Sequence, residues 1–173
     1  MTASLKLRVV PSVLAIGLAV AGALAPASAL ARDVCDRDAG ICVTVPDSWT
    51  TNMVNGVLVI SEPGRTMALE LRIVTQLDQL ARARADFERE LGGRFDELQW
   101  RGEATPAQQN GMTGIVRTGG GRFRDATREQ IRFFMLALGH QRAGVVGLGI
   151  ITERGRANAA VMEMILNSIR AAS

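Results

Sequence analysis

The stretch ICVTVPDSWTT, which begins at Ile41, constrains the fold more than any other part of this sequence. Ile41, Val43 and Val45 alternate with more polar residues, and this is the period of a strand with one buried face. Pro46 ends the strand because it has no N–H group for a ladder hydrogen bond. Trp49 follows, and we expect so large a ring to close one end of the core.

The spacing of apolar residues predicts seven strands and two helices, in the order three strands, helix, four strands, helix. The strands are expected at residues 41–45, 57–61, 67–74, 97–105, 112–118, 127–138 and 143–152, and the helices at 76–91 and 156–171. Runs of strands joined by hairpins, with helices inserted between them, are typical of an antiparallel α+β sheet with helices packed on it. Residues 133–138 are apolar on both faces, so we expect their strand to be central.

Glycine, proline and polar residues mark the expected breaks between these elements. Thr75 and Asp78 resemble a capping box at the start of the first helix, and Gly92-Gly93 predicts its end. Residues 106–110 predict a polar turn, and residues 119–121, which are three glycines, predict a flexible loop.

Residues 1–31 have the composition of a cleaved export signal. Lys6 and Arg8 precede an apolar run, and two Ala-x-Ala sites follow it, ending at Ala29 and at Ala31. We favour cleavage after Ala31. A retained membrane anchor is the alternative, but the run is interrupted by Pro and Gly and is shorter than the ~20 strongly apolar residues that a spanning helix needs.

After cleavage at the favoured site we expect residues 32–173 to form a single α+β domain with no integral membrane span, in the periplasm or outside the cell. Its basic residues are 18 arginines and no lysine, against 17 acids. The arginines are spread along the chain and interleaved with acids, so we do not expect a nucleic-acid partner.

Two cysteines, Cys35 and Cys42, lie in the predicted mature chain. An exported protein meets an oxidising compartment, so we expect a disulfide between them. The bridge closes a short loop and ties the new N-terminus to the first strand, worth about 2–3 kcal/mol on the chain-entropy model. A redox-active pair is the alternative, but it favours the spacing Cys-x-x-Cys.

The sequence offers no catalytic constellation, so we do not expect an enzyme. His140 is the only histidine, and it lies in a predicted turn. Asp33, Asp36 and Asp38 could suggest calcium, but the closing Glu of a calcium loop is absent, and we expect neither a metal nor a cofactor. Asp96 and Glu97 are adjacent, and strand geometry predicts opposite faces for them.

Four short stretches resemble the PsbP-like superfamily, which includes the extrinsic P subunit of photosystem II, the Ran-binding Mog protein and exported bacterial proteins of the DcrB type. The stretches are residues 43–49 (VTVPDSW), 57–64, 110–114 (NGMTG) and 164–169. The resemblance implies a curved antiparallel sheet of about six to seven strands sandwiched between helices. It brings no catalytic residues, because members mainly bind other proteins or assist assemblies.

Two functional hypotheses follow. The first is an exported, non-enzymatic module that docks an unknown protein partner in the bacterial cell envelope. The expected partner-binding residues are Arg122, Phe123 and Arg124. They place an aromatic side chain between two cations, which is a common composition of protein interfaces. An ordinary connection with one anchor is the alternative for these residues.

The second hypothesis is a carrier that holds an apolar ligand or peptide between sheet and helix. Gly147 and Gly149 share one face of a strand, and Met135, Met162 and Met164 could line an adaptable groove beside them. Close packing of a helix on the glycines is the alternative.

Overall fold

The computed structural model describes residues 30–172. All but the last two residues of the predicted signal peptide, 1–31, lie outside the described residues. Within residues 30–172, no helix combines the length and the apolar character needed to cross a membrane.

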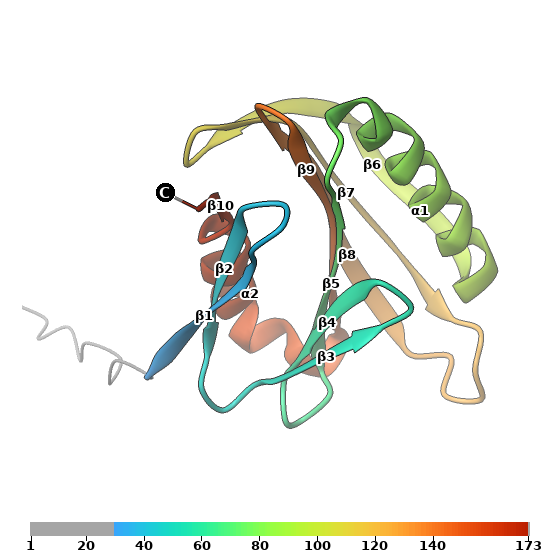
Figure 1. Ribbon diagram of the computed structural model, residues 1–173. Helices are drawn as coiled ribbons and strands as arrows, with labels where there is room; N and C mark the ends of the chain where they lie inside the picture. Colours follow the sequence, from blue (N-terminus) through green and yellow to red (C-terminus); the bar gives the residue numbers. More distant parts are fainter. Residues whose placement is uncertain (1–29, 173) are drawn as a thin grey trace, which may run out of the picture.

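The described chain folds into two antiparallel sheets and two α-helices (Figure 1). The strands are β1 (Ala31–Asp36), β2 (Ile41–Pro46), β3 (Thr50–Val54), β4 (Val57–Ser61), β5 (Met67–Val74), β6 (Phe95–Gln109), β7 (Met112–Phe123), β8 (Gln130–His140), β9 (Ala143–Thr152) and β10 (Arg170–Ala171). The helices are α1 (Leu80–Arg94) and α2 (Ala159–Asn167), each preceded by a 3-10 segment, η1 (Leu77–Gln79) and η2 (Glu153–Asn158).

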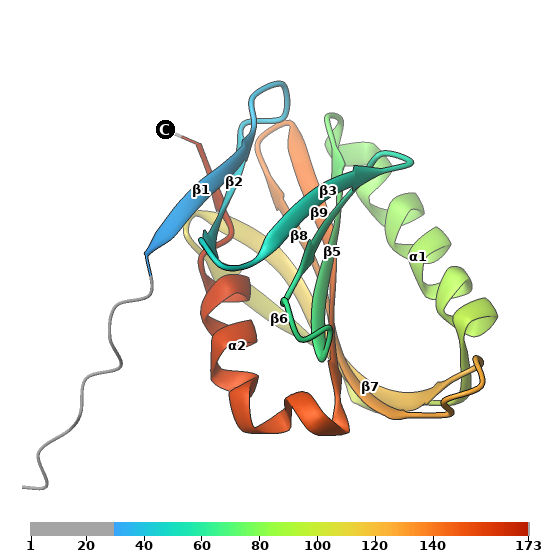
Figure 2. The same ribbon diagram turned by 90° about the horizontal axis from the view of Figure 1, so that it is seen from below.

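The large sheet has seven strands in the order β3-β4-β5-β9-β8-β7-β6, and every neighbouring pair is antiparallel. Figures 1 and 2 show that the sheet is curved, with α1 on one face and α2 on the other. The three-stranded sheet β1-β2-β10 lies on the same side as α2. The predicted α+β class, and the sheet between helices that the resemblance implies, are therefore confirmed.

Each face of the large sheet has its own apolar core. On the α2 face, alternate residues of β4, β5, β8 and β9 pack with β2 and α2. On the α1 face, the other residues of β8 and β9 pack with α1, where Phe87 and Leu91 are almost fully buried. All of β9 is buried and it is the middle strand, and both faces of β8 are covered along residues 133–138, as predicted.

Trp49 follows β2 as predicted and is only 5% exposed. It belongs to the α2-face core together with Ile41, Val43 and Val45, the alternating residues of β2. This stretch therefore places one layer of the α2-face core, and the Trp ring extends that core beyond the end of the strand.

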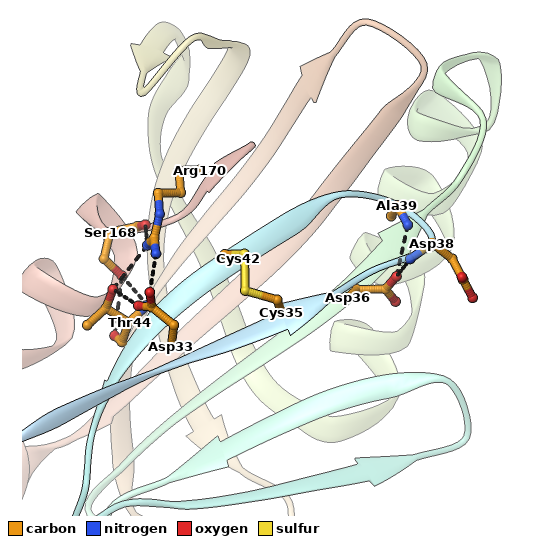
Figure 3. The surroundings of a disulfide bond; sticks show 9 residues. All are labelled: Asp33, Cys35, Asp36, Asp38, Ala39, Cys42, Thr44, Ser168 and Arg170. Atoms are coloured by element: carbon orange, nitrogen blue, oxygen red, sulfur yellow. Dashed lines mark hydrogen bonds and ion pairs between the residues drawn. A yellow bond between two sulfur atoms is a disulfide. The ribbon is translucent and has the colours of Figure 1, made fainter. Parts of the chain in front are cut away.

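The disulfide joins Cys35 to Cys42, as predicted (Figure 3). The two residues lie directly opposite each other in a β1–β2 hairpin, with Cα atoms 4.0 Å apart. The sequence did not predict β1, because its residues ARDVCD carry little apolar periodicity.

Polar contacts on β1 and β2 also hold the C-terminus (Figure 3). Asp33 accepts hydrogen bonds from Thr44 Oγ1 at 2.7 Å and from Arg170 Nη2 at 2.5 Å. The Thr44 hydrogen bond, followed by Arg170, lowers the pKa of Asp33 below its ordinary value of 3.8. Ser168 Oγ accepts the Thr44 N–H at 2.9 Å, so the end of α2 is tied to β2.

The first helix differs from its prediction at both ends. It begins with η1, and neither η1 nor α1 has a side-chain cap hydrogen bond, so the capping box is wrong. It also continues through Gly92-Gly93 to Arg94. Glycine costs about 1 kcal/mol in a helix, but Arg94 donates to both carboxylate oxygens of Glu70 at 2.6 Å, which holds the last turn against β5.

Residues 106–110, predicted as a turn, are strand up to Gln109, and the turn is Asn110-Gly111, where both residues have positive φ. The polar side chains have another role. Gln109 Nε2 donates to Leu166 O and Asn110 Nδ2 donates to Asn167 O, both at 2.8 Å. These amides add hydrogen bonds to backbone carbonyls at the C-terminal end of α2, where the helix supplies few partners of its own.

The predicted flexible loop at residues 119–121 is wrong, because these glycines belong to β7. Gly119 pairs with Trp100 of β6 and with Phe133 of β8. A Cβ atom at position 119 would lie 2.2 Å from the Phe133 ring, so glycine is needed for that ring to lie across the strand. Trp100 packs edge-on against the same ring, with centroids 5.0 Å apart.

The last predicted helix, residues 156–171, is shorter than expected. The chain forms η2 first, α2 ends at Asn167, and Arg170–Ala171 then pair with Ile41 and Cys42 of β2. Residues 170–171, predicted as the end of the helix, are therefore a strand of the small sheet.

Candidate functional site

The three residues predicted to bind a partner lie at the end of β7 and immediately after it, and they do not share one face. Arg122 lies on the α2 face, where its Nε donates to Glu97 at 2.9 Å. Phe123 packs on Phe95 in the α1-face core, with ring centroids 5.2 Å apart. Arg124 is exposed and its Nε donates to Asp96 at 2.7 Å. The aromatic side chain therefore does not lie between the two cations on one exposed surface, as was expected.

Arg122 lines a pocket on the α2 face that was not predicted from the sequence. We call this the arginine pocket, with a volume of about 220 Å³. Its lining residues are Glu97, Gln99, Trp100, Arg101, Gly120, Gly121, Arg122, Gln130, Ile131, Arg132 and Arg156.

Gly120 forms the floor of the arginine pocket. It pairs with Gln99 of β6 on one side and with Arg132 of β8 on the other, so these three residues form one row across the sheet. A Cβ atom at position 120 would meet only the backbone oxygen of Ile131 at 3.1 Å, because no side chain covers this point of the sheet. The glycine therefore leaves a gap in a surface that is otherwise lined by long polar side chains.

The charge of the arginine pocket is strongly positive, since four arginines and one acid line it. Arg122 pairs with Glu97, and Arg156 pairs with Glu153 at 2.5 Å. Within the described part of the chain, Arg101 and Arg132 have neither an ion pair nor a side-chain hydrogen bond, and both are exposed. Two guanidinium groups therefore face the pocket without a partner.

The two acids at the start of β6, Asp96 and the pocket residue Glu97, are already paired with arginines. Arg128 reaches Asp96 at 2.9 Å and Glu97 at 3.6 Å, although the two acids were expected on opposite faces. The difference arises because β6 has a register irregularity here and Glu97 has a φ of 54°. A bulge of this kind redirects a side chain toward its neighbour.

The β7–β8 connection next to the pocket is held by two further acids. Asp125 accepts hydrogen bonds from the hydroxyl and the N–H of Thr127, and these hydrogen bonds lower its pKa. Glu129 pairs with Arg154 through two hydrogen bonds, at 3.0 and 3.1 Å, which lower the pKa of Glu129. Both carboxylates remain charged and engaged at neutral pH, so they do not compete for Arg101 or Arg132.

The residues considered for catalysis and metal binding have local partners. His140 Nδ1 lies 3.0 Å from Gly111 O. Asp36 accepts the N–H groups of Asp38 and Ala39 and so closes the β1–β2 turn, while Asp33 pairs with Arg170 (Figure 3). Over residues 30–172, no three metal-binding side chains form a cluster.

The space that was expected to form an apolar groove is filled by side chains. A Cβ atom on Gly149 would lie 3.1 Å from Met162 Sδ, and one on Gly147 would lie 2.9 Å from Leu71. Met135 lies in the core on the opposite face, and Met164 is half exposed. The glycines therefore serve close packing of α2 and β5, which was the alternative interpretation.

A second surface combines exposed apolar side chains with charges that are already paired. Met53 and Val54 on the edge strand β3 are 63% and 51% exposed. Val54, Val57, Val59 and Phe87 line a groove of about 410 Å³ between α1 and β4. The neighbouring charges are already paired as Arg72–Glu90 and Arg94–Glu70, so the groove offers no free charge to select a ligand.

Three of the pocket arginines, Arg101, Arg132 and Arg156, were missed by sequence reasoning. They are far apart in the sequence and come from β6, β8 and η2, so only the strand register brings them together. For Arg101 and Arg132 the sequence offered one signal, the alternation of residues in a strand, which predicts the face of a side chain but not its neighbours on other strands. Arg156 lies in a 3-10 segment and had no such signal.

No protein-family model matches this sequence, and no curated protein sequence matches it. Solved structures are similar to it in fold. The cyanobacterial PsbP (CyanoP) from Synechocystis sp. PCC 6803 has a TM-score of 0.56 at 14% identity, over 93% of this chain and 98% of that chain. The Saccharomyces cerevisiae Ran-binding protein Mog1p has a TM-score of 0.53 at 9% identity, over 83% of this chain and 96% of that chain.

A protein from Bacteroides thetaiotaomicron VPI-5482 has a TM-score of 0.55 at 10% identity. The match covers 82% of this chain but 48% of that one, so this chain spans about half the length of the Bacteroides protein. These likenesses agree with the curved sheet between two helices described above. The chain has the PsbP-like fold.

Proposed function

We propose that this protein is an exported, non-enzymatic module that docks a protein partner in the bacterial cell envelope. The fold supports recognition of proteins, since one structural neighbour is described as Ran-binding. The Cys35–Cys42 disulfide supports an oxidising compartment. The predicted export signal, residues 1–31, supplies the route to it.

The arginine pocket is the observation that carries the proposal. Arg101 and Arg132 lie two rows apart on the two strands that flank β7, and neither has a charge partner in the described chain. Of the 18 arginines of residues 32–173, 12 have an ion pair within the described chain, and Arg101 and Arg132 are the two unpaired ones that line this pocket. Unpaired cations beside a gap in the sheet suit a partner that supplies the missing groups.

Site-specific photo-cross-linking tests this proposal. Gln99 and Gln108 are both exposed and both lie on β6, but Gln99 lines the arginine pocket and Gln108 lies near the other end of the strand. A cross-linking amino acid at position 99 is expected to give one discrete adduct with an envelope protein, and position 108 is expected to give none. The absence of an adduct at position 99, or equal adducts from both positions, contradicts the proposal.

A further inference from the structure

We infer that the arginine pocket binds carboxylate groups of an acidic segment in the partner protein. This inference rests on the proposed function and names the chemistry of its docking site. It is carried by the shape of the pocket, by its size and by the charge of its walls.

The shape follows from strand register. Gln99 and Arg132 flank Gly120 in one row, and strands lie about 4.8 Å apart, so these two residues start roughly 10 Å from each other across the gap. Arg101 starts two positions further along β6, on the same face as Gln99. A ligand group that binds over Gly120 of β7 therefore lies between Arg101 of β6 and Arg132 of β8.

The chemistry of the walls selects carboxylates. A guanidinium group is a planar fork of donors that fits the two oxygens of a carboxylate. The amide groups of Gln99 and Gln130 add neutral donors at the rim. The only acid in the lining, Glu97, is already bound by Arg122 and Arg128, so it leaves Arg101 and Arg132 available.

The size indicates a side-chain group rather than a free metabolite. A pocket of about 220 Å³ is smaller than the ~300–1,000 Å³ typical of sites that enclose a small molecule. It has room for the ends of acidic side chains while the rest of the segment stays outside, across β6 and β8.

A protein segment also fits better than a membrane surface. The predicted mature chain has 18 basic and 17 acidic residues, so it has little overall attraction for anionic lipid. Trp100, the one aromatic in the lining, packs against Phe133 and is not available for insertion. The positive charge is local and requires a partner that brings its carboxylates to this point.

Fluorescence anisotropy with a labelled oligoglutamate peptide tests the inference on the mature protein at low ionic strength. Oligoglutamine of equal length is the uncharged comparison. We expect saturable binding of oligoglutamate only, and we expect R101Q/R132Q to weaken it about tenfold, since two charge pairs at an exposed site are lost.

The matched control is R37Q/R142Q. Arg37 and Arg142 are also exposed and without an ion pair in the described chain, and the charge change is the same. Arg132 lies near the start of β8 and Arg142 lies in the turn after its end, about 30 Å further along the strand direction. The control is expected to bind oligoglutamate as the parent chain does, and thermal unfolding of both variants verifies that each remains folded.

Three results overturn the inference. They are no binding of oligoglutamate, equal weakening in both double variants, and binding to phosphatidylglycerol vesicles that depends on Arg101 and Arg132 while oligoglutamate does not bind. If one of these results is obtained and the cross-link from position 99 still forms, the inference about carboxylate binding is wrong, but the proposed docking of a protein partner is retained. If the parent chain gives no adduct from position 99, the proposed function itself is contradicted.

Discussion

At the scale of single residues, glycine has three different roles in this chain. Gly119 makes room for the Phe133 ring, and Gly120 leaves the floor of the arginine pocket open. Gly92 lies exposed in α1, where an added Cβ atom would have no neighbour within 4 Å. The sequence signals a break at all three positions. Only the neighbours of each glycine in the fold distinguish these roles.

This difference predicts opposite effects of the same substitution. Gly119→Ala is expected to destabilise the protein by about 1–3 kcal/mol, because its Cβ collides with the Phe133 ring and lies 2.7 Å from Gln99 O. Gly92→Ala is expected to stabilise it by about 0.5–1 kcal/mol, because alanine favours the helix and meets no obstacle. Urea unfolding of the two variants measures both effects, and a shift of the same sign in both contradicts this account.

At the scale of elements, strand β1 is attached to β2 by the disulfide and by polar contacts more than by buried apolar side chains. Every second residue of β1 is exposed, while β2 is almost fully buried. The bridge and the Asp33–Arg170 pair therefore attach β1 to a strand that the core already holds.

Replacing both cysteines with serine is expected to lower the free energy of unfolding by about 2–3 kcal/mol, the chain-entropy value for a loop of this length. Calorimetry of the double variant checks the size of the effect. Amide hydrogen exchange is expected to rise in β1 and to change little in β9, which is buried along its whole length. Unchanged stability without the bridge would show that it contributes nothing to the fold.

The start of β1 also bears on signal cleavage. Leu30 O accepts the Asp47 N–H at 2.8 Å, and Ala31 pairs with Pro46. Cleavage after Ala29 keeps both residues in the hairpin, whereas cleavage after Ala31 removes them. These contacts favour the other Ala-x-Ala site over the predicted cleavage after Ala31. We therefore propose Leu30 in place of Arg32 as the mature N-terminus, and an intact mass of the exported protein that begins at Arg32 would contradict this.

Periodicity predicted most elements well, and the failures have physical causes. β5 and β9 have the predicted bounds, because both carry a clear strand pattern between glycine or proline turns. β1 and β3 were missed because few of their residues are buried. The turn at 106–110 was misplaced because its polar residues cap α2, a contact between segments about 57 positions apart that no local pattern contains.

At the scale of the whole molecule, the candidate site could be predicted only in part. Arg122 was among the residues predicted to bind a partner and it lines the pocket, but the prediction placed it in a loop with Phe123 and Arg124. Alternation in a strand places Arg122 and Phe123 on opposite faces, and this follows only once residues 119–123 are known to be strand. The remaining arginines join the site through the antiparallel register of β6, β7 and β8.

The yield of the Gln99 cross-link in three otherwise identical chains tests the central claim most directly. The arginine pocket predicts a strong adduct in the parent chain, a much weaker one in R101Q/R132Q, and an undiminished one in R37Q/R142Q. Equal yields in all three chains, or a weaker adduct in R37Q/R142Q than in R101Q/R132Q, would contradict docking through the arginine pocket.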